Sequence, residues 1–119
     1  MKAYTDMQQS RKLAKILPLE SADMCWIKID DDESFDGSWE VVSKNSSLIA
    51  IDDEPLFCWS LAALLYILPD RTCVYKKTYK DGRVKYKGIA EGIKELILKD
   101  NPFDACYELV LKLHEFKML

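Results

Sequence analysis

The stretch CVYKKTYKDGRVKYK, residues 73–87, decides the fold, because it predicts an antiparallel β-hairpin. Two runs rich in tyrosine, valine and lysine, 73–79 and 83–87, flank the dipeptide of Asp81 and Gly82. Asp-Gly between two such runs is a strong signal for a two-residue hairpin turn, whose central positions need positive φ. We therefore expect a hairpin in which Lys80 pairs with Arg83.

This register divides the hairpin into a basic face and a core-facing one, since residues directly opposite each other share a face of the sheet. It places Thr78 opposite Lys85, and Lys76 opposite Lys87. The candidate interaction surface is the basic face, made of Lys76, Lys80, Arg83, Lys85 and Lys87. The opposite face holds Cys73, Tyr75, Tyr79, Val84 and Tyr86, with Lys77 as an exception, and we expect it to face the core.

Opposed like charges cost stability, so the basic face needs something to balance it. Solvent, the acidic residues 30–33 and an external polyanion such as nucleic acid are the three alternatives. Because the tyrosines point away from the lysines in this register, we expect no stacking of bases on this surface.

Helices are expected on both sides of the hairpin. Thr5 and Gln8 form a capping-box pattern before a helix over 6–17, and an apolar helix spans 55–69. At the other end Asn101 caps a helix over 102–117, with Pro102 at its first position. The segment 89–99 suggests a short helix, although 96–98 also fits a strand.

The remaining pattern predicts strands, and together the elements set the fold class. Residues 25–29 alternate as a strand, and 39–43 and 48–51 flank a turn at 44–47. With 119 residues and no internal repeat or linker, we expect a single α+β domain over 1–119, with helices packed on one face of a small antiparallel sheet.

Composition points to the cytoplasm and away from several classes of protein. The net charge of -3 gives no global attraction to nucleic acid, and no apolar run suggests export or a membrane span. The four cysteines form no C-x-x-C pair and the chain has one histidine, His114. We therefore expect free thiols, with no structural zinc and no cofactor.

Two constellations are weighed against plain structural roles. Cys58 and Trp59, expected at a helix start, are similar to the Cys-Trp pair of papain-like proteases, with His114 as the one available base. Packing at the helix start is the alternative that we favour. The other constellation matches the first positions of an EF-hand loop, although Ser43 replaces its glutamate and a solvated acidic loop is the alternative. Its residues are Asp32, Ser34, Asp36, Gly37 and Glu40.

Three segments carry a resemblance to known proteins. They are YTDMQQSRKLAKILPLESADM at 4–24, CWSLAALL at 58–65 and DACYELVLKLHE at 104–115. They resemble a family of short uncharacterised proteins of gut bacteria and their mobile elements. The resemblance implies one domain with three anchoring segments and a role linked to phages or mobile elements, and it implies no catalytic residue.

The sequence thus favours a small, non-enzymatic, cytoplasmic interaction protein. Its expected partner is an unidentified protein or a second copy of itself, with no membrane contact. The first alternative is weak association with nucleic acid through the hairpin 73–87, and the second is a cysteine-dependent hydrolase. No catalytic, cofactor-binding or metal-binding residue is assigned.

Overall fold

The computed structural model describes residues 3–29, 38–46, 49 and 55–119. The expected α+β class is confirmed, and every strand pairing is antiparallel. The described strands form two three-stranded sheets, whereas we expected one. The chain divides into two compact units, Tyr4–Ser60 and a second one that contains Leu61–Leu119, and each is described separately. The expectation of a single domain stays a prediction.

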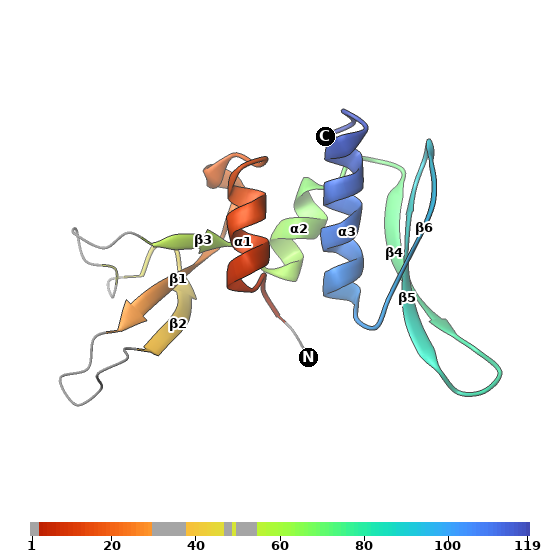
Figure 1. Cartoon of the computed structure of the whole chain (residues 1–119), viewed down its shortest axis with the longest axis horizontal. Helices are drawn as coiled ribbons and strands as arrows, with labels where there is room; N and C mark the ends of the chain where they lie inside the picture. The colour runs from red at the N-terminus through yellow and green to blue at the C-terminus, as the bar shows by residue number, and fades with distance from the viewer. Residues whose placement is uncertain (1–2, 30–37, 47–48, 50–54) are drawn as a thin grey trace. The chain divides into compact units, whose positions relative to one another are not determined.

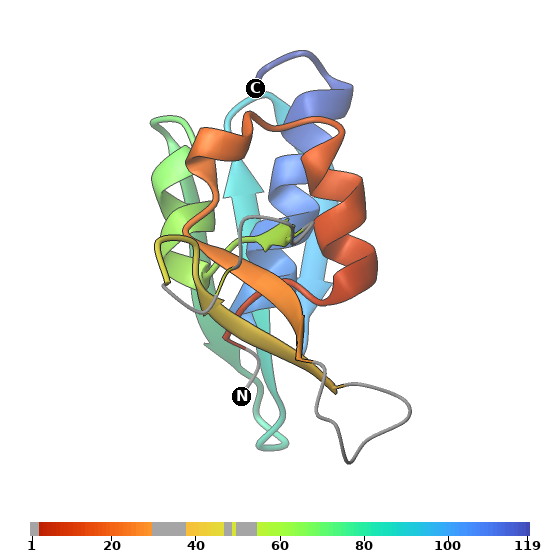
Figure 2. The same ribbon diagram turned by 90° about the vertical axis from the view of Figure 1, so that its left-hand side faces the viewer.

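The first unit combines one helix with a sheet in the order β2-β1-β3 (Figure 2). Its elements are α1 (Met7–Ala14), the 3-10 turn η1 (Leu19–Ser21), β1 (Met24–Ile29), β2 (Ser38–Ser43) and β3 (Leu56–Cys58). The strands expected at 25–29 and 39–43 are therefore confirmed, whereas most of 48–51 lies outside the described residues.

The first helix begins one residue later than its capping pattern predicts. Asp6 is the N-cap, and its carboxylate accepts a hydrogen bond from the Gln9 backbone N–H at 2.7 Å. Thr5 is instead buried, and its hydroxyl accepts a hydrogen bond from the Trp59 N–H at 3.0 Å. The helix ends at Ala14, so the expected limits 6–17 were too wide.

The expected buried helix over 55–69 is wrong in its first half. Residues Leu56–Cys58 form β3, which pairs with β1 within the first unit, Tyr4–Ser60. Only Leu61–Ile67 is helical, as α2, and among its side chains Leu64 alone is buried. Apolar periodicity could not separate a short inner strand from a helix, because the whole run is hydrophobic.

The second unit carries the predicted hairpin (Figure 1). After α2 it contains β4 (Thr72–Thr78), β5 (Val84–Ala90), β6 (Ile93–Lys99) and α3 (Pro102–Glu115). The strands form a sheet in the order β4-β5-β6, and α3 contacts all three of them. The segment 89–99 is therefore mainly strand: the short helix suggested there is wrong, and the alternative of a strand at 96–98 is confirmed.

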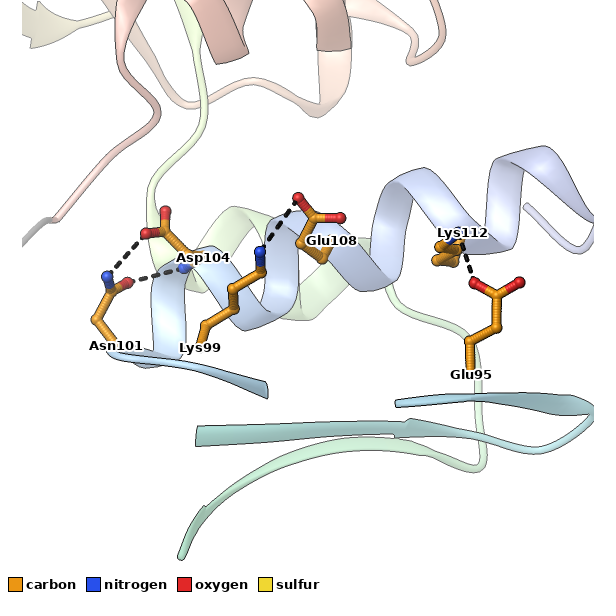
Figure 3. A network of polar contacts seen from close by, with 6 residues as sticks. All are labelled: Glu95, Lys99, Asn101, Asp104, Glu108 and Lys112. Atoms are coloured by element: carbon orange, nitrogen blue, oxygen red, sulfur yellow. Dashed lines mark hydrogen bonds and ion pairs between the residues drawn. The ribbon is translucent and has the colours of Figure 1, made fainter. Parts of the chain in front are cut away.

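Helix α3 begins and packs as its sequence predicts. Asn101 is the N-cap and accepts a hydrogen bond from the Asp104 N–H at 2.8 Å, with Pro102 at the first turn. Two ion pairs tie the helix to β6, Lys112 with Glu95 at 2.5 Å and Lys99 with Glu108 at 3.8 Å (Figure 3). Residues of α3, β5 and β6 also form an apolar core, which consists of Ala90, Ile97, Ala105, Leu109 and Leu113.

Candidate nucleic-acid interface

The β4–β5 hairpin has a different register from the one expected. Lys77 lies opposite Lys85, and Thr78 opposite Val84. The Tyr79 N–H donates to the Arg83 carbonyl at 2.8 Å, and the Gly82 N–H donates to the Tyr79 carbonyl at 3.0 Å. The loop therefore has three residues rather than two, with Gly82 at φ 89° as the left-handed third residue of that loop.

A shift of one residue moves side chains to the other face, so the assignment of the faces changes. The helix-side face now holds Val74, Tyr86, Gly88 and Ala90, of which the last two are buried. A Cβ on Gly88 would meet Leu109 of α3 at 3.0 Å, which shows that this face lies against the helix. The opposite face of the sheet is consequently the exposed one.

We call the exposed side of this sheet the open face. On β4, β5 and the two residues that flank the turn it consists of Cys73, Tyr75, Lys77, Tyr79, Arg83, Lys85, Lys87 and Ile89. Cys73, Tyr75 and Tyr79 therefore share a face with cations, contrary to the prediction that they face the core. Val84 and Tyr86 lie on the helix side, as expected. Each of the two tyrosines on this face has a cation opposite it. Lys87 pairs with Tyr75 in the sheet, and Arg83 lies opposite Tyr79, whose backbone N–H donates to the Arg83 carbonyl.

The expected interaction surface is only partly brought together. Arg83, Lys85 and Lys87 do share the open face, but Lys76 lies on the helix-side face opposite Tyr86. Lys80 is in the turn. The open face gains Lys77, which sequence reasoning treated as an exception.

Tyr79 is the centre of the cationic cluster on the open face. Lys77 Nζ lies 5.2 Å from the centroid of its ring, and the Arg83 guanidinium carbon lies 5.3 Å from it. Both distances fall within the range of cation–π attraction. Tyr75, two residues before Lys77 on the same face, is 38% exposed. Two aromatic rings, the exposed Tyr75 and the half-buried Tyr79, thus lie among cations at the surface.

Positive charge is concentrated around this hairpin. Residues 71–90 hold seven lysines and arginines but one acid, Asp81. Exposed ion pairs engage three of these cations: Arg83 with Asp81 at 2.7 Å, Arg71 with Glu91 at 2.9 Å, and Lys85 with Asp100. Within the described residues no ion pair joins the other four to a carboxylate. They are Lys76, Lys77, Lys80 and Lys87.

The same asymmetry divides the whole chain, and it is a signal that sequence reasoning missed. Residues 61–119 contain 11 lysines and arginines against 8 acids, for a formal charge of +3, whereas 1–60 contain 6 against 12, for -6. The net charge of -3 hides this division. Charge counted separately for 1–60 and 61–119 shows that the second of these segments is net positive.

The open face becomes apolar toward β6. Leu96 is 70% exposed and Ile89 is 41% exposed. Together with Lys87 and Lys94 they line a shallow hollow of about 220 Å³ beside the irregular pairing of β5 with β6. The face therefore offers apolar contact area next to its cations.

Cys58 does not have the surroundings of a nucleophile. It is fully buried at the end of β3 rather than at a helix start. Burial raises the pKa of its thiol to about 12, and Cys25 and Asp23 add to the rise. The thiol is therefore protonated at neutral pH, whereas a catalytic thiolate needs a lowered pKa. His114 belongs to the other unit, as an exposed residue of the last turn of α3.

Most of the candidate calcium loop lies outside the described residues. Asp32, Ser34, Asp36 and Gly37 lie outside the described residues, and Glu40 is part of β2. Among the described residues no three histidine, cysteine or acidic side chains are grouped so that they could hold a metal ion.

Comparison with models of protein families, with curated proteins and with solved structures finds no match for the chain. The resemblance to short proteins of gut bacteria therefore stays a prediction, and function is inferred from geometry and charge. In the part of the chain that the structure describes, no helix has the length and apolar character needed to span a bilayer.

Proposed function

We propose that this protein is a non-enzymatic module that binds nucleic acid through the open face of the β4–β5–β6 sheet. One observation carries the proposal: the three-residue turn places Tyr75 and Lys77 of β4, and Tyr79 just after it, on the same face as the cations of β5. The alternative that the sequence ranked second thereby becomes the one that the geometry supports best.

The cations suit the backbone of a nucleic acid. Lysines that neutralise phosphates release condensed counterions, and this release provides most of the sequence-independent affinity. Lys77 and Lys87 have no competing carboxylate among the described residues, so they are available to phosphates. Lys85 is already paired with Asp100, an exposed pair that costs little to break.

A protein with an acidic surface is the other partner that could neutralise this face. The exposed Leu96 and Ile89 would add apolar contact to such a complex. The two tyrosines favour nucleic acid, because aromatic rings among lysines and arginines are the combination on which bases stack. Binding to an acidic protein is therefore the alternative that the experiment below distinguishes from binding to nucleic acid.

The proposal places the protein in the cytoplasm and assigns it no catalysis. All four cysteines are free, and free thiols persist in a reducing compartment. The raised pKa of Cys58 argues against a cysteine-dependent hydrolase.

Two neighbouring lysines allow a matched test of the face. Lys77 lies on the open face and Lys76 on the helix-side face of the same strand, and both are exposed. Lys77→Glu and Lys76→Glu therefore change the net charge equally. Fluorescence anisotropy with labelled oligonucleotides, at low and at physiological salt, measures the affinity of the full chain and of each variant.

We expect Lys77→Glu to weaken binding far more than Lys76→Glu, because charges further apart than about 8 Å are screened at physiological salt. The dependence of log K on log salt should also become shallower by about 0.7 for a single strand, corresponding to one lost phosphate contact. Equal losses in the two variants would contradict the assignment of the face. Poly-glutamate that binds as tightly as the oligonucleotides would favour an acidic protein partner instead.

A further inference from the structure

We propose that the open face selects single-stranded nucleic acid over duplex, with Tyr75 and Tyr79 as the rings on which unpaired bases stack. This inference rests on the proposed function and names the class of nucleic acid that the same surface takes. Two observations support it: the placement of the two rings, and the absence of Asn and Gln from the open face as described.

The two rings alternate with a cation along one strand. Tyr75 lies on β4 and Tyr79 follows one residue after its end, four residues further on, a separation of about 13 Å at roughly 3.3 Å per residue of extended chain. Lys77 lies between them on the same face, opposite Lys85. A single strand of nucleic acid laid along β4 would therefore meet a ring, a cation and a second ring in turn. Its bases could stack on the rings while a phosphate lies beside the cation.

The surroundings of Tyr79 suit a base that replaces a cation. Lys77 is exposed and has no ion pair among the described residues, so its ammonium can leave the ring for a neighbouring phosphate. Arg83 stays beside the ring because Asp81 accepts a hydrogen bond from its Nε at 2.7 Å and another from its backbone N–H at 3.0 Å. A base on Tyr79 would thus gain a ring and a guanidinium together.

A duplex cannot use these rings in the same way. Its bases are already stacked on one another and expose only their edges in the grooves. Reading edges calls for side chains such as Asn, Gln, Arg or Lys. The described open face has no Asn or Gln, its Arg83 is held by Asp81, and its lysines are the same groups that would neutralise phosphates. Duplex binding would therefore rest mainly on phosphates, and single-strand binding would show little sequence preference.

The experiment measures the affinity of the full chain for an oligothymidine and for a duplex of equal length. Tyr79→Leu keeps an apolar side chain but removes the ring, whereas Tyr79→Phe keeps the ring. Tyr66→Leu is the control, since Tyr66 lies on α2 and is 92% exposed. Thermal unfolding of each variant checks that it folds.

We expect Tyr79→Leu to weaken binding to the oligothymidine by about 5- to 150-fold, while duplex binding, Tyr79→Phe and Tyr66→Leu stay near wild type. The loss should be similar at low and physiological salt, because stacking releases no counterions, whereas the loss from Lys77→Glu shrinks with salt. If Tyr79→Leu binds single strands like the wild type while Lys77→Glu still weakens binding, stacking is refuted and the proposed function stands. If the wild type binds neither nucleic acid, both fail.

Discussion

Gly88 and Leu109 provide a direct test of which face of the sheet lies against α3. A Cβ on Gly88 would lie 3.0 and 3.1 Å from two carbons of Leu109 and 3.2 Å from a methyl of Ile97. Carbon atoms prefer about 3.5–4.0 Å, so these neighbours would have to retreat by about half an ångström. Leu109 is fully buried and Ile97 is 4% exposed, so neither can move into solvent.

The Gly88→Ala substitution should therefore overpack the core. Overpacking costs about 1–3 kcal/mol, and the better backbone entropy of alanine returns roughly 0.5–1 kcal/mol. We expect a net loss of about 0–2.5 kcal/mol in the free energy of unfolding. Leu109→Ala alone should cost about 2–5 kcal/mol, through lost burial and the cavity that it leaves.

The variant that carries both substitutions tests whether positions 88 and 109 are in contact. In the Leu109→Ala background the added methyl at position 88 enters the cavity, so the two losses should sum to more than the loss in the double variant, by about 1 kcal/mol or more. Urea unfolding followed by circular dichroism measures all four proteins. Circular dichroism is needed because Trp26, Trp39 and Trp59 all belong to the other unit. Losses that add within about 0.5 kcal/mol would refute the contact and with it the observed register.

Three further predictions concern the core and the thiols. Leu113→Ala should lower the free energy of unfolding by about 2–5 kcal/mol in the same urea experiment, because Leu113 is fully buried in the α3 core; an unchanged midpoint would contradict this. Asn101→Ala should cost about 0.5–2 kcal/mol in that experiment by removing the N-cap of α3, and Asn101→Ser, which keeps a capping oxygen, should restore part of it. Iodoacetamide at neutral pH should label the exposed Cys73 first, while the buried Cys25, Cys58 and Cys106, whose thiol pKa values are all raised, react only on unfolding; early labelling of Cys58 would revive the hydrolase hypothesis.

The elements with strong local signals could be predicted from the sequence. Asn101, Pro102 and the apolar stripe of α3 combine a cap, a first-turn proline and one helical period, and the structure has all three. The hairpin was equally evident, because few sequences besides Asp-Gly favour so tight a turn. Helix 55–69 failed because a run that is apolar on every side has no period to read.

The register of the hairpin could not be fixed by the same signal. Asp81 and Gly82 fit a two-residue turn, but Gly82 also fits the left-handed third position of a loop that starts at Lys80. The choice depends on α3, since Gly88 and Ala90 are the small residues that let the helix approach the sheet. That packing is tertiary, so the turn dipeptide does not contain it. The error mattered because the expected register, wrong by one residue, placed Tyr75 and Tyr79 on the opposite face of the hairpin from Lys85 and Lys87.

The side chains of the lysines provide the most direct measurement of where nucleic acid binds. Reductive methylation with ¹³C labels every amino group while keeping its charge, and NMR spectra then follow each lysine during titration with an oligothymidine. We expect the largest shifts for Lys77 and Lys87 on the open face, and little change for Lys76 on the helix-side face or for Lys112 on α3. Shifts of Lys76 that exceed those of Lys77 would contradict the claim that the open face is the binding surface.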